Sequence, residues 1–115
     1  MNVFISQPMS GLTDEEILKR RNELIEMISS KFKGETIQVI DSFNKPDELV
    51  KKGRIAMLGH SISMMYNADI VVFATGWDKS PGCRVEHEVC VQYKLMRFYE
   101  DILWQEHKPP SEKKE

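Results

Sequence analysis

The sequence has no long apolar segment and no excess of charge of one sign. Its 115 residues include 16 Lys and Arg against 18 Asp and Glu, which gives a formal net charge of −2. Proteins that bind nucleic acid usually show a basic excess or a basic block, so we expect no nucleic-acid partner. No apolar run approaches the about 20 residues that a helix needs to cross a bilayer, so we expect no membrane contact.

Cysteine is also scarce, since the chain has only Cys83 and Cys90. On one helix they would lie about 10 Å apart along the axis, whereas a disulfide requires Cα atoms within about 7 Å. Reduced thiols, and a first strand without the basic segment of a secretory signal, predict a cytoplasmic protein. Cys83, His87 and Cys90 share helical spacing, but a structural metal site usually needs a fourth ligand. We therefore predict neither metal nor cofactor, and a Cys83–His87 nucleophile pair lacks a third, orienting group.

The chain instead contains apolar strands that alternate with amphipathic helices. Strands are predicted over residues 2–6, 36–40, 69–74 and 95–99, and helices after the Thr13 cap, over 58–67 and over 82–93. This order predicts a three-layer α/β fold, Rossmann- or flavodoxin-like, with about four to five parallel strands and helices on both faces. We predict one domain over residues 1–100, followed by a partly disordered C-terminal extension over 101–115 that is rich in charge.

The near-continuous apolar run at 69–74 is typical of a central strand that is buried on both faces. In open parallel sheets, ligands bind outside the carboxyl ends of the strands. Two loops leave such ends and lead into helices, at residues 7–12 and 75–81. These loops are therefore the predicted location of a functional site.

Glu86 is the carboxylate that the helical pattern places inward. At about 100° per residue it shares a helix face with Val89, Cys90 and Tyr93. An inward carboxylate is costly unless it is paired or used, and carboxylates serve as nucleophiles in glycosyl transfer. The alternative is an acid near the helix start that stabilises the helix dipole and points to water.

The residues before this helix allow two interpretations. Ser80, Pro81 and Gly82 could direct a hydroxyl and backbone amides at a phosphate, or could form an ordinary turn and helix cap. Trp77 could stack on a base or pack against a helix end. The loop at 7–11 contains polar residues and a glycine but neither dinucleotide-binding nor P-loop spacing.

Three motifs together resemble the nucleoside 2-deoxyribosyltransferase superfamily over about residues 1–99. They are the strand and loop VFISQPMSG at 3–11, the strand ADIVV at 68–72, and the spacing Ser80-x-Gly82-x-x-x-Glu86. The chain is more closely similar to a branch of small uncharacterised bacterial and phage proteins. The resemblance implies the same parallel α/β fold.

In that superfamily, a glutamate attacks the anomeric carbon of a 2-deoxynucleoside or its 5′-monophosphate, and water or another base then takes the sugar. The resemblance implies that Glu86 is the nucleophile and that Ser80 contacts a phosphate or sugar. It also implies a homodimer or higher homo-oligomer, because members complete their pockets across a subunit interface. The expected substrate contacts, from the motifs and the loops together, are Gln7, Pro8, Met9, Ser10, Gly11, Ser61, Trp77, Ser80 and Gly82.

The chain departs from the superfamily at two places. Many members carry an aspartate eight residues before the strand aspartate, and counting back from Asp69 gives Ser61, which cannot replace a carboxyl acid or base. Where phosphate-binding members often have an arginine, the first loop has Met9 and Ser10.

We favour a nucleoside deoxyribosyltransferase or a nucleotide N-glycosidase (a hydrolase). The alternative is a catalytically reduced module that binds a nucleotide or sugar phosphate. Asp69 begins its strand and is expected at the amino edge of the sheet, away from the site.

Overall fold

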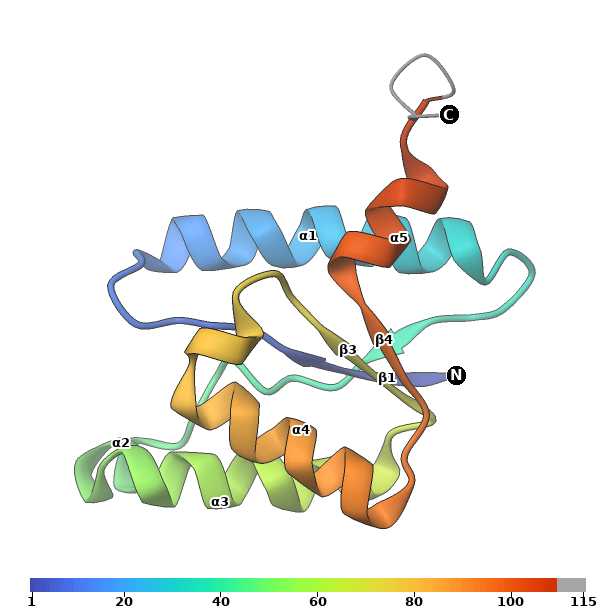
Figure 1. Ribbon diagram of the computed structural model, residues 1–115. Helices are drawn as coiled ribbons and strands as arrows, with labels where there is room; N and C mark the ends of the chain where they lie inside the picture. The colour runs from blue at the N-terminus through green and yellow to red at the C-terminus, as the bar shows by residue number, and fades with distance from the viewer. Residues whose placement is uncertain (110–115) are drawn as a thin grey trace.

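A computed structural model describes residues 1–109 and shows a four-stranded parallel sheet (Figure 1). The strand order is β2-β1-β3-β4. The strands are β1 (Asn2–Ser6), β2 (Gln38–Val39), β3 (Ile70–Phe73) and β4 (Arg97–Tyr99). The α-helices are α1 (Asp14–Lys31), α2 (Asp47–Lys52), α3 (Arg54–Met64), α4 (Pro81–Tyr93) and α5 (Glu100–His107), and short 3-10 turns cover Met65–Asn67 and Trp77–Lys79.

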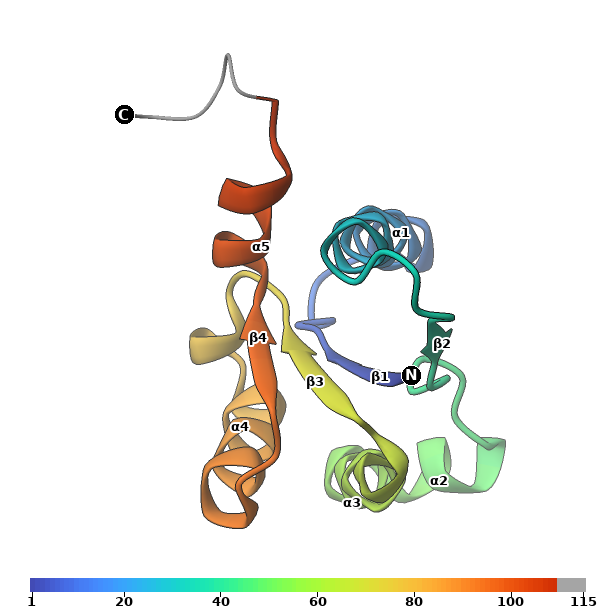
Figure 2. The same cartoon turned by 90° about the vertical axis from the view of Figure 1, so that its right-hand side faces the viewer.

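The sheet forms the middle of three layers, as Figure 2 shows. Helices α1 and α5 cover one face, and α3 and α4 cover the other. Alternate strand residues feed two cores: Val3 and Ile5 pack with Leu24 and Leu103, whereas Phe4 packs on the opposite face with Cys90. This alternation follows from the two-residue period of a strand. The predicted fold class is confirmed.

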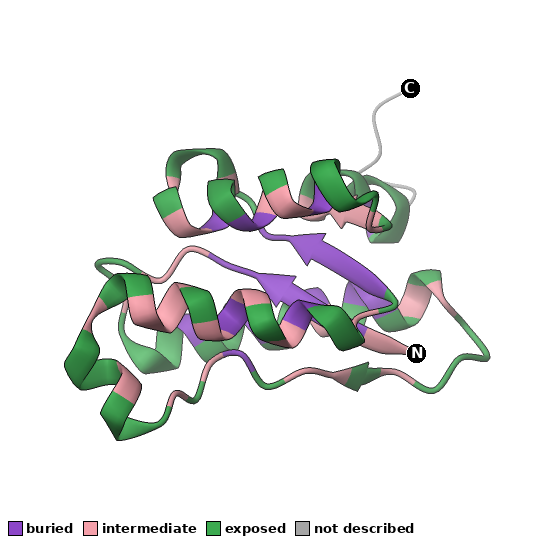
Figure 3. Cartoon of the chain, turned by 90° about the horizontal axis from the view of Figure 1, so that it is seen from below, coloured by how far each residue is buried: buried purple, intermediate pink, exposed green. Residues whose placement is uncertain are grey.

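The most apolar strand is also the most deeply buried. All four residues of β3 are buried, and it pairs with β1 on one side and β4 on the other (Figure 3). The prediction of a central strand is therefore confirmed. Asp69 lies just before β3 and accepts a hydrogen bond from the Asn2 backbone amide at 2.6 Å, so it is at the amino edge of the sheet as expected.

Both outer strands are shorter than the sequence predicted. The strand expected over 36–40 pairs only at Gln38–Val39, because Asp41 accepts the backbone amides of Phe43 and Asn44 and turns the chain away. The strand expected over 95–99 starts at Arg97. Leu95 lies in the turn that closes α4, since its amide donates to the Cys90 carbonyl at 2.9 Å.

Helix is more extensive between β2 and β3 than predicted. The sequence predicted no helix before residue 58 in this region, yet α2 starts at Asp47, after Pro46 at the cap position. Gly53, with φ of 97°, separates α2 from α3, which starts at Arg54 rather than near residue 58. Apolar spacing alone missed this part because α2 has no buried residue.

The residues after β4 continue into α5, which packs on α1. Leu103 is buried against the α1 side of the sheet, and Lys31 forms an ion pair with Glu106 at 2.8 Å. The extension predicted for 101–115 thus contains an ordered helix up to His107. The predicted disorder at 110–115 lies outside the described residues. Within residues 1–109, no helix is long and apolar enough to span a membrane.

Candidate functional site

A cavity of about 840 Å³ opens at the carboxyl edge of the sheet, at the left of Figure 1. The loops that follow β1 and β2, the helix α3 and the first turns of α4 form its walls. The predicted site residues that line it are Gln7, Met9, Ser10, Ser61, Ser80, Gly82 and Glu86. The structure thus brings together most of the residues that the sequence selected.

Glu86 lines this cavity and is buried. It is only 7% exposed, and its Oε1 accepts a hydrogen bond of 2.6 Å from the Ser6 hydroxyl at the end of β1. The side chain points inward with Cys90, as the helical pattern predicted, so the alternative of a solvent-facing helix-start acid is excluded. Tyr93, the last residue of α4, was predicted on the same inward face, but it is 78% exposed.

The start of α4 aims Glu86 at the cavity. Ser80 caps the helix by accepting the Cys83 backbone amide at 3.5 Å, and Pro81 occupies the first turn, where its missing N–H costs nothing. The Ser80 hydroxyl and Gly82 line the same cavity, on the wall that follows β3. The helix cap is therefore confirmed, whereas the phosphate contact stays a prediction.

Burial dominates the electrostatics of Glu86. Removal from water raises the pKa of its carboxyl, whereas the Ser6 hydrogen bond and the positive charge of Lys45 lower it. An ionised carboxylate here has little water around it and few hydrogen-bond donors. Such a carboxylate is well suited to attack an electrophilic carbon.

Lys45 is a cavity residue that the sequence analysis missed. It lies in the loop after β2, and its Nζ donates a hydrogen bond to the Ser61 hydroxyl on α3. Burial lowers the pKa of Lys45, whereas the negative charges of Glu86 and Asp41 raise it. Its sequence position could have identified it, because it follows a predicted strand and so lies at the same edge of the sheet as the loops at 7–12 and 75–81.

The loop after β2 is held in place by two contacts. Asp41 accepts the backbone amides of Phe43 and Asn44 at 3.2 and 3.1 Å, which forms a tight turn just before Lys45. Ser42 is buried and accepts a hydrogen bond of 3.1 Å from the Arg21 guanidinium on α1. These contacts reduce the freedom of the loop that carries Lys45.

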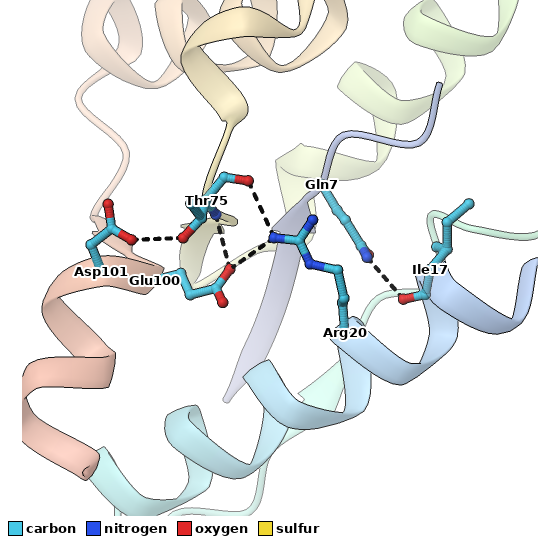
Figure 4. A network of polar contacts seen from close by, with 6 residues as sticks. All are labelled: Gln7, Ile17, Arg20, Thr75, Glu100 and Asp101. Atoms are coloured by element: carbon cyan, nitrogen blue, oxygen red, sulfur yellow. Dashed lines mark hydrogen bonds and ion pairs between the residues drawn. The ribbon is translucent and has the colours of Figure 1, made fainter. Parts of the chain in front are cut away.

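Gln7 has a free acceptor in the cavity wall. Its Nε2 donates to the Ile17 carbonyl at 2.8 Å, which fixes the orientation of the amide (Figure 4). Its Oε1 is buried and has no hydrogen-bond partner among the described residues. A ligand hydroxyl or amino group could satisfy this oxygen.

The loop after β3 is anchored by a polar network on the side of α5 (Figure 4). The Thr75 amide donates to Glu100 Oε1 at 2.9 Å, and its hydroxyl donates to Asp101 Oδ1 at 2.7 Å. Arg20 donates to the Thr75 carbonyl at 3.4 Å and lies 3.8 Å from Glu100. This network fixes the start of the segment that leads to Ser80.

Three predicted contact residues do not line the cavity. Trp77 stacks on His87, with ring centroids 4.1 Å apart, and therefore packs against a helix rather than facing the cavity. Gly11 is exposed and adopts φ of 79°, so its contribution is to the turn. Pro8 lies near Gly76, outside the cavity wall.

Neither cysteine forms a disulfide, and both are buried. Burial raises the pKa of Cys83, and that of Cys90 to about 11, so both thiols are protonated at neutral pH. The His87 ring hydrogen-bonds to the Tyr99 hydroxyl at 2.7 Å. Across residues 1–109, no group of three or more His, Cys, Asp or Glu side chains could hold a metal ion.

Fold and cavity together define a parallel α/β protein with a buried carboxylate at the carboxyl edge of its sheet. The chain belongs to the family described as a domain of unknown function, DUF4406, which matches residues 1–98. The matched region contains every residue that lines the cavity, and it ends within β4, before α5. Neither a curated protein nor a solved structure matches the chain.

Proposed function

We propose that this chain cleaves or transfers the N-glycosidic bond of a nucleoside or a nucleoside 5′-monophosphate through a covalent glycosyl intermediate on Glu86. The observation that carries the proposal is the buried Glu86 carboxyl, which accepts a hydrogen bond from Ser6 and lines a cavity of about 840 Å³. Cavities of about 300–1,000 Å³ are the usual size for small-molecule ligands. The motif around Ser80, Gly82 and Glu86 resembles that of the nucleoside 2-deoxyribosyltransferase superfamily.

In the first step, a Glu86 oxygen forms a bond to the anomeric carbon while the bond from that carbon to the base breaks. The electron pair of the broken bond leaves with the base nitrogen. In the second step, water or a second base attacks the same carbon and releases the carboxylate. Ser6 and Lys45 both favour the ionised form of Glu86, which the first step requires.

The remaining cavity groups suggest how such a substrate would lie. Gln7 Oε1 can accept a hydrogen bond from a sugar hydroxyl, because it has no other partner among the described residues. Ser80 and Gly82 sit at the amino end of α4, where the helix dipole favours an anionic group such as a 5′-phosphate. We assign the phosphate or sugar end of the substrate to this wall.

The alternative is a module of the same fold that binds a nucleotide or sugar phosphate without turnover. Ser61 favours the binding module, because many members of the superfamily that the chain resembles carry an aspartate at this position, and Ser61 has a hydroxyl instead of a carboxyl. The two functions differ in one measurable way: the enzyme releases free base, and the module only binds.

The test is a chromatographic assay for free base, with ribo- and 2-deoxynucleosides and their 5′-monophosphates as substrates. We expect release from one class, and a loss of orders of magnitude in Glu86→Gln with ligand binding retained. Glu88→Gln is the matched control, because Glu88 is exposed on the same helix. Turnover that survives in Glu86→Gln would rule out this nucleophile. Binding without base release by the unmodified protein would support the module instead.

We also propose that the chain forms a homodimer or a higher homo-oligomer. Exposed apolar side chains border the cavity: Val50, Ile55 and Val85 are 51%, 87% and 43% exposed. A second copy that covered them would also close the cavity mouth to water. Sedimentation at low micromolar concentration should show a dimer or larger species, and monomer alone would contradict this assignment.

A further inference from the structure

We infer that Lys45, held by Ser61, is the acid that protonates the leaving base. The inference rests on the proposed function and assigns a second catalytic residue in the same cavity. It starts from one contact: Lys45, in the loop after β2, lines the cavity, and its ammonium donates a hydrogen bond to the hydroxyl of Ser61, which also lines it. Ser61 therefore orients the Lys45 ammonium, which can donate a proton, although the serine hydroxyl cannot act as the acid itself.

The strand order places Lys45 on the side of the cavity that is free for the base. β1 lies between β2 and β3. Glu86 is bonded to Ser6 at the end of β1, the segment from Ser80 to Gly82 follows β3, and Lys45 follows β2. A substrate with its anomeric carbon at Glu86 and its phosphate near Ser80 would direct its base toward Lys45.

The surroundings of Lys45 leave its ammonium charged and without a direct ion-pair partner among the described residues. Its hydrogen-bond acceptor is a neutral hydroxyl, so the ammonium is oriented without being consumed in an ion pair. The ionisable groups that face it or share its cavity are Glu86 and Cys83 on α4, Asp41 in its own loop, Arg21 and Asp14 on α1, and Arg54 on α3. Burial and Arg21 lower the pKa of Lys45, which makes it a better proton donor than a lysine in water.

The proton balance closes within the cavity. As the bond between the anomeric carbon and the base breaks, the base nitrogen takes its electron pair and accepts a proton from Lys45 Nζ. The neutral amine then accepts a proton from the attacking water, whose oxygen forms the new bond to the sugar. Glu86 leaves as a carboxylate, and the ammonium is restored.

The Lys45 ammonium could instead bind the phosphate of the substrate. Two substrates without a phosphate distinguish this role from that of an acid catalyst. A purine 2-deoxynucleoside methylated on its imidazole ring carries a positively charged base, which leaves as a neutral molecule and needs no proton. The ordinary purine 2-deoxynucleoside does need one. Neither substrate carries a phosphate, so a purely phosphate-binding Lys45 would leave both rates unchanged on substitution.

The experiment measures base release from both substrates by the intact chain and by three variants. Lys45→Met should slow release of the ordinary base by about 10²–10⁴-fold, the usual contribution of an acid catalyst, and of the methylated base by less than about tenfold. Lys45→Arg should show the same selective loss, because arginine keeps its charge but does not give up its proton. Lys52→Met, on the exposed surface of α2, is the control and should match the unmodified protein on both substrates.

A second readout is the dependence of rate on pH. Release of the ordinary base should fall on the alkaline side as Lys45 loses its proton, and this decline should be absent with the methylated base. Equal losses on both substrates, or full rescue by Lys45→Arg, would overturn the assignment of Lys45 and leave Glu86 as nucleophile. No release of either base by the unmodified protein would overturn the proposed function and this inference together.

Discussion

Glu86 combines deep burial with the absence of a direct ion pair within residues 1–109. Among the described residues, the side chain of Glu86 accepts its one hydrogen bond from a neutral hydroxyl, that of Ser6, and the balance of effects leaves its pKa raised. A group chosen for stability alone would be apolar or fully paired at such a position. The proposed role of Glu86 as a nucleophile would account for this local cost.

That cost should be visible in how stability depends on pH. Because the folded chain raises the pKa of Glu86 above its ordinary value of 4.5, the folded state binds this proton more tightly than the unfolded state. The stabilisation is complete below the unfolded pKa and is lost as pH rises through the folded pKa. Glutamine resembles the protonated carboxyl, so Glu86→Gln should melt at a higher temperature than the unmodified chain at mildly alkaline pH.

Thermal melts across a pH series would measure this difference, which should shrink as the pH falls below 4.5. The control is Glu88→Gln on the exposed face of α4, for which we expect no difference in melting temperature that shrinks as the pH falls. If the unmodified protein were as stable as Glu86→Gln at alkaline pH, Glu86 would not carry a raised pKa.

Among the site residues, some could be predicted from the sequence and others could not. Glu86 was identifiable because an inward carboxylate breaks the apolar face of a helix. Lys45 was not, because a lysine in a polar loop gives no periodic signal, and its direction depends on the turn at Asp41 and on contact with Ser61. For Trp77 the sequence left two interpretations, and the structure shows the second one, packing against a helix, here on His87.

Among the elements, α4 is the one on which the site depends. Ser80 caps its start, and Lys94 ends it with φ of 56°, in the left-handed region that glycine adopts more readily. The Leu95 amide then returns to the Cys90 carbonyl and closes the helix. The ends of α4 are therefore set by two residues outside it rather than by its own apolar pattern.

Replacement of Lys94 by glycine should relieve the strain at this helix end. We expect Lys94→Gly to raise the free energy of unfolding by about 0.5–1 kcal/mol, because glycine adopts the left-handed conformation without strain. This value is the net gain after the larger entropy loss of glycine on folding is subtracted. Urea titration would measure the change. Gln92→Gly, in the helical last turn, is the matched control and should lower stability, whereas a lower stability for Lys94→Gly would contradict this interpretation of the helix end.

Over the whole molecule, the parallel sheet and its two covered faces could be predicted from the alternation of strands and helices. The outer elements could not. β2 pairs over two residues and α2 buries none, so neither has a clear pattern. α5 was assigned to an extension because its three apolar residues are consecutive rather than spaced along one helix face, and only Leu103 among them is buried.

The integration of α5 into the domain can be tested at Leu103, which is 1% exposed beside α1 and the sheet. Leu103→Ala should lower the free energy of unfolding by about 2–5 kcal/mol, the usual range for removal of a buried leucine side chain. Ile102→Ala is the control, because Ile102 is 56% exposed and should change little. Equal stability of the two variants would mean that α5 is not part of the cooperative fold.

The central claim is that Glu86 forms a covalent bond to a sugar. The direct measurement is intact-protein mass spectrometry after reaction with a substrate whose second step is slow, such as a nucleoside fluorinated next to the anomeric carbon, followed by peptide mapping. We predict an added mass equal to the glycosyl group, located on Glu86 and absent from Glu86→Gln. Base release without any adduct, or an adduct on another residue, would contradict the claim.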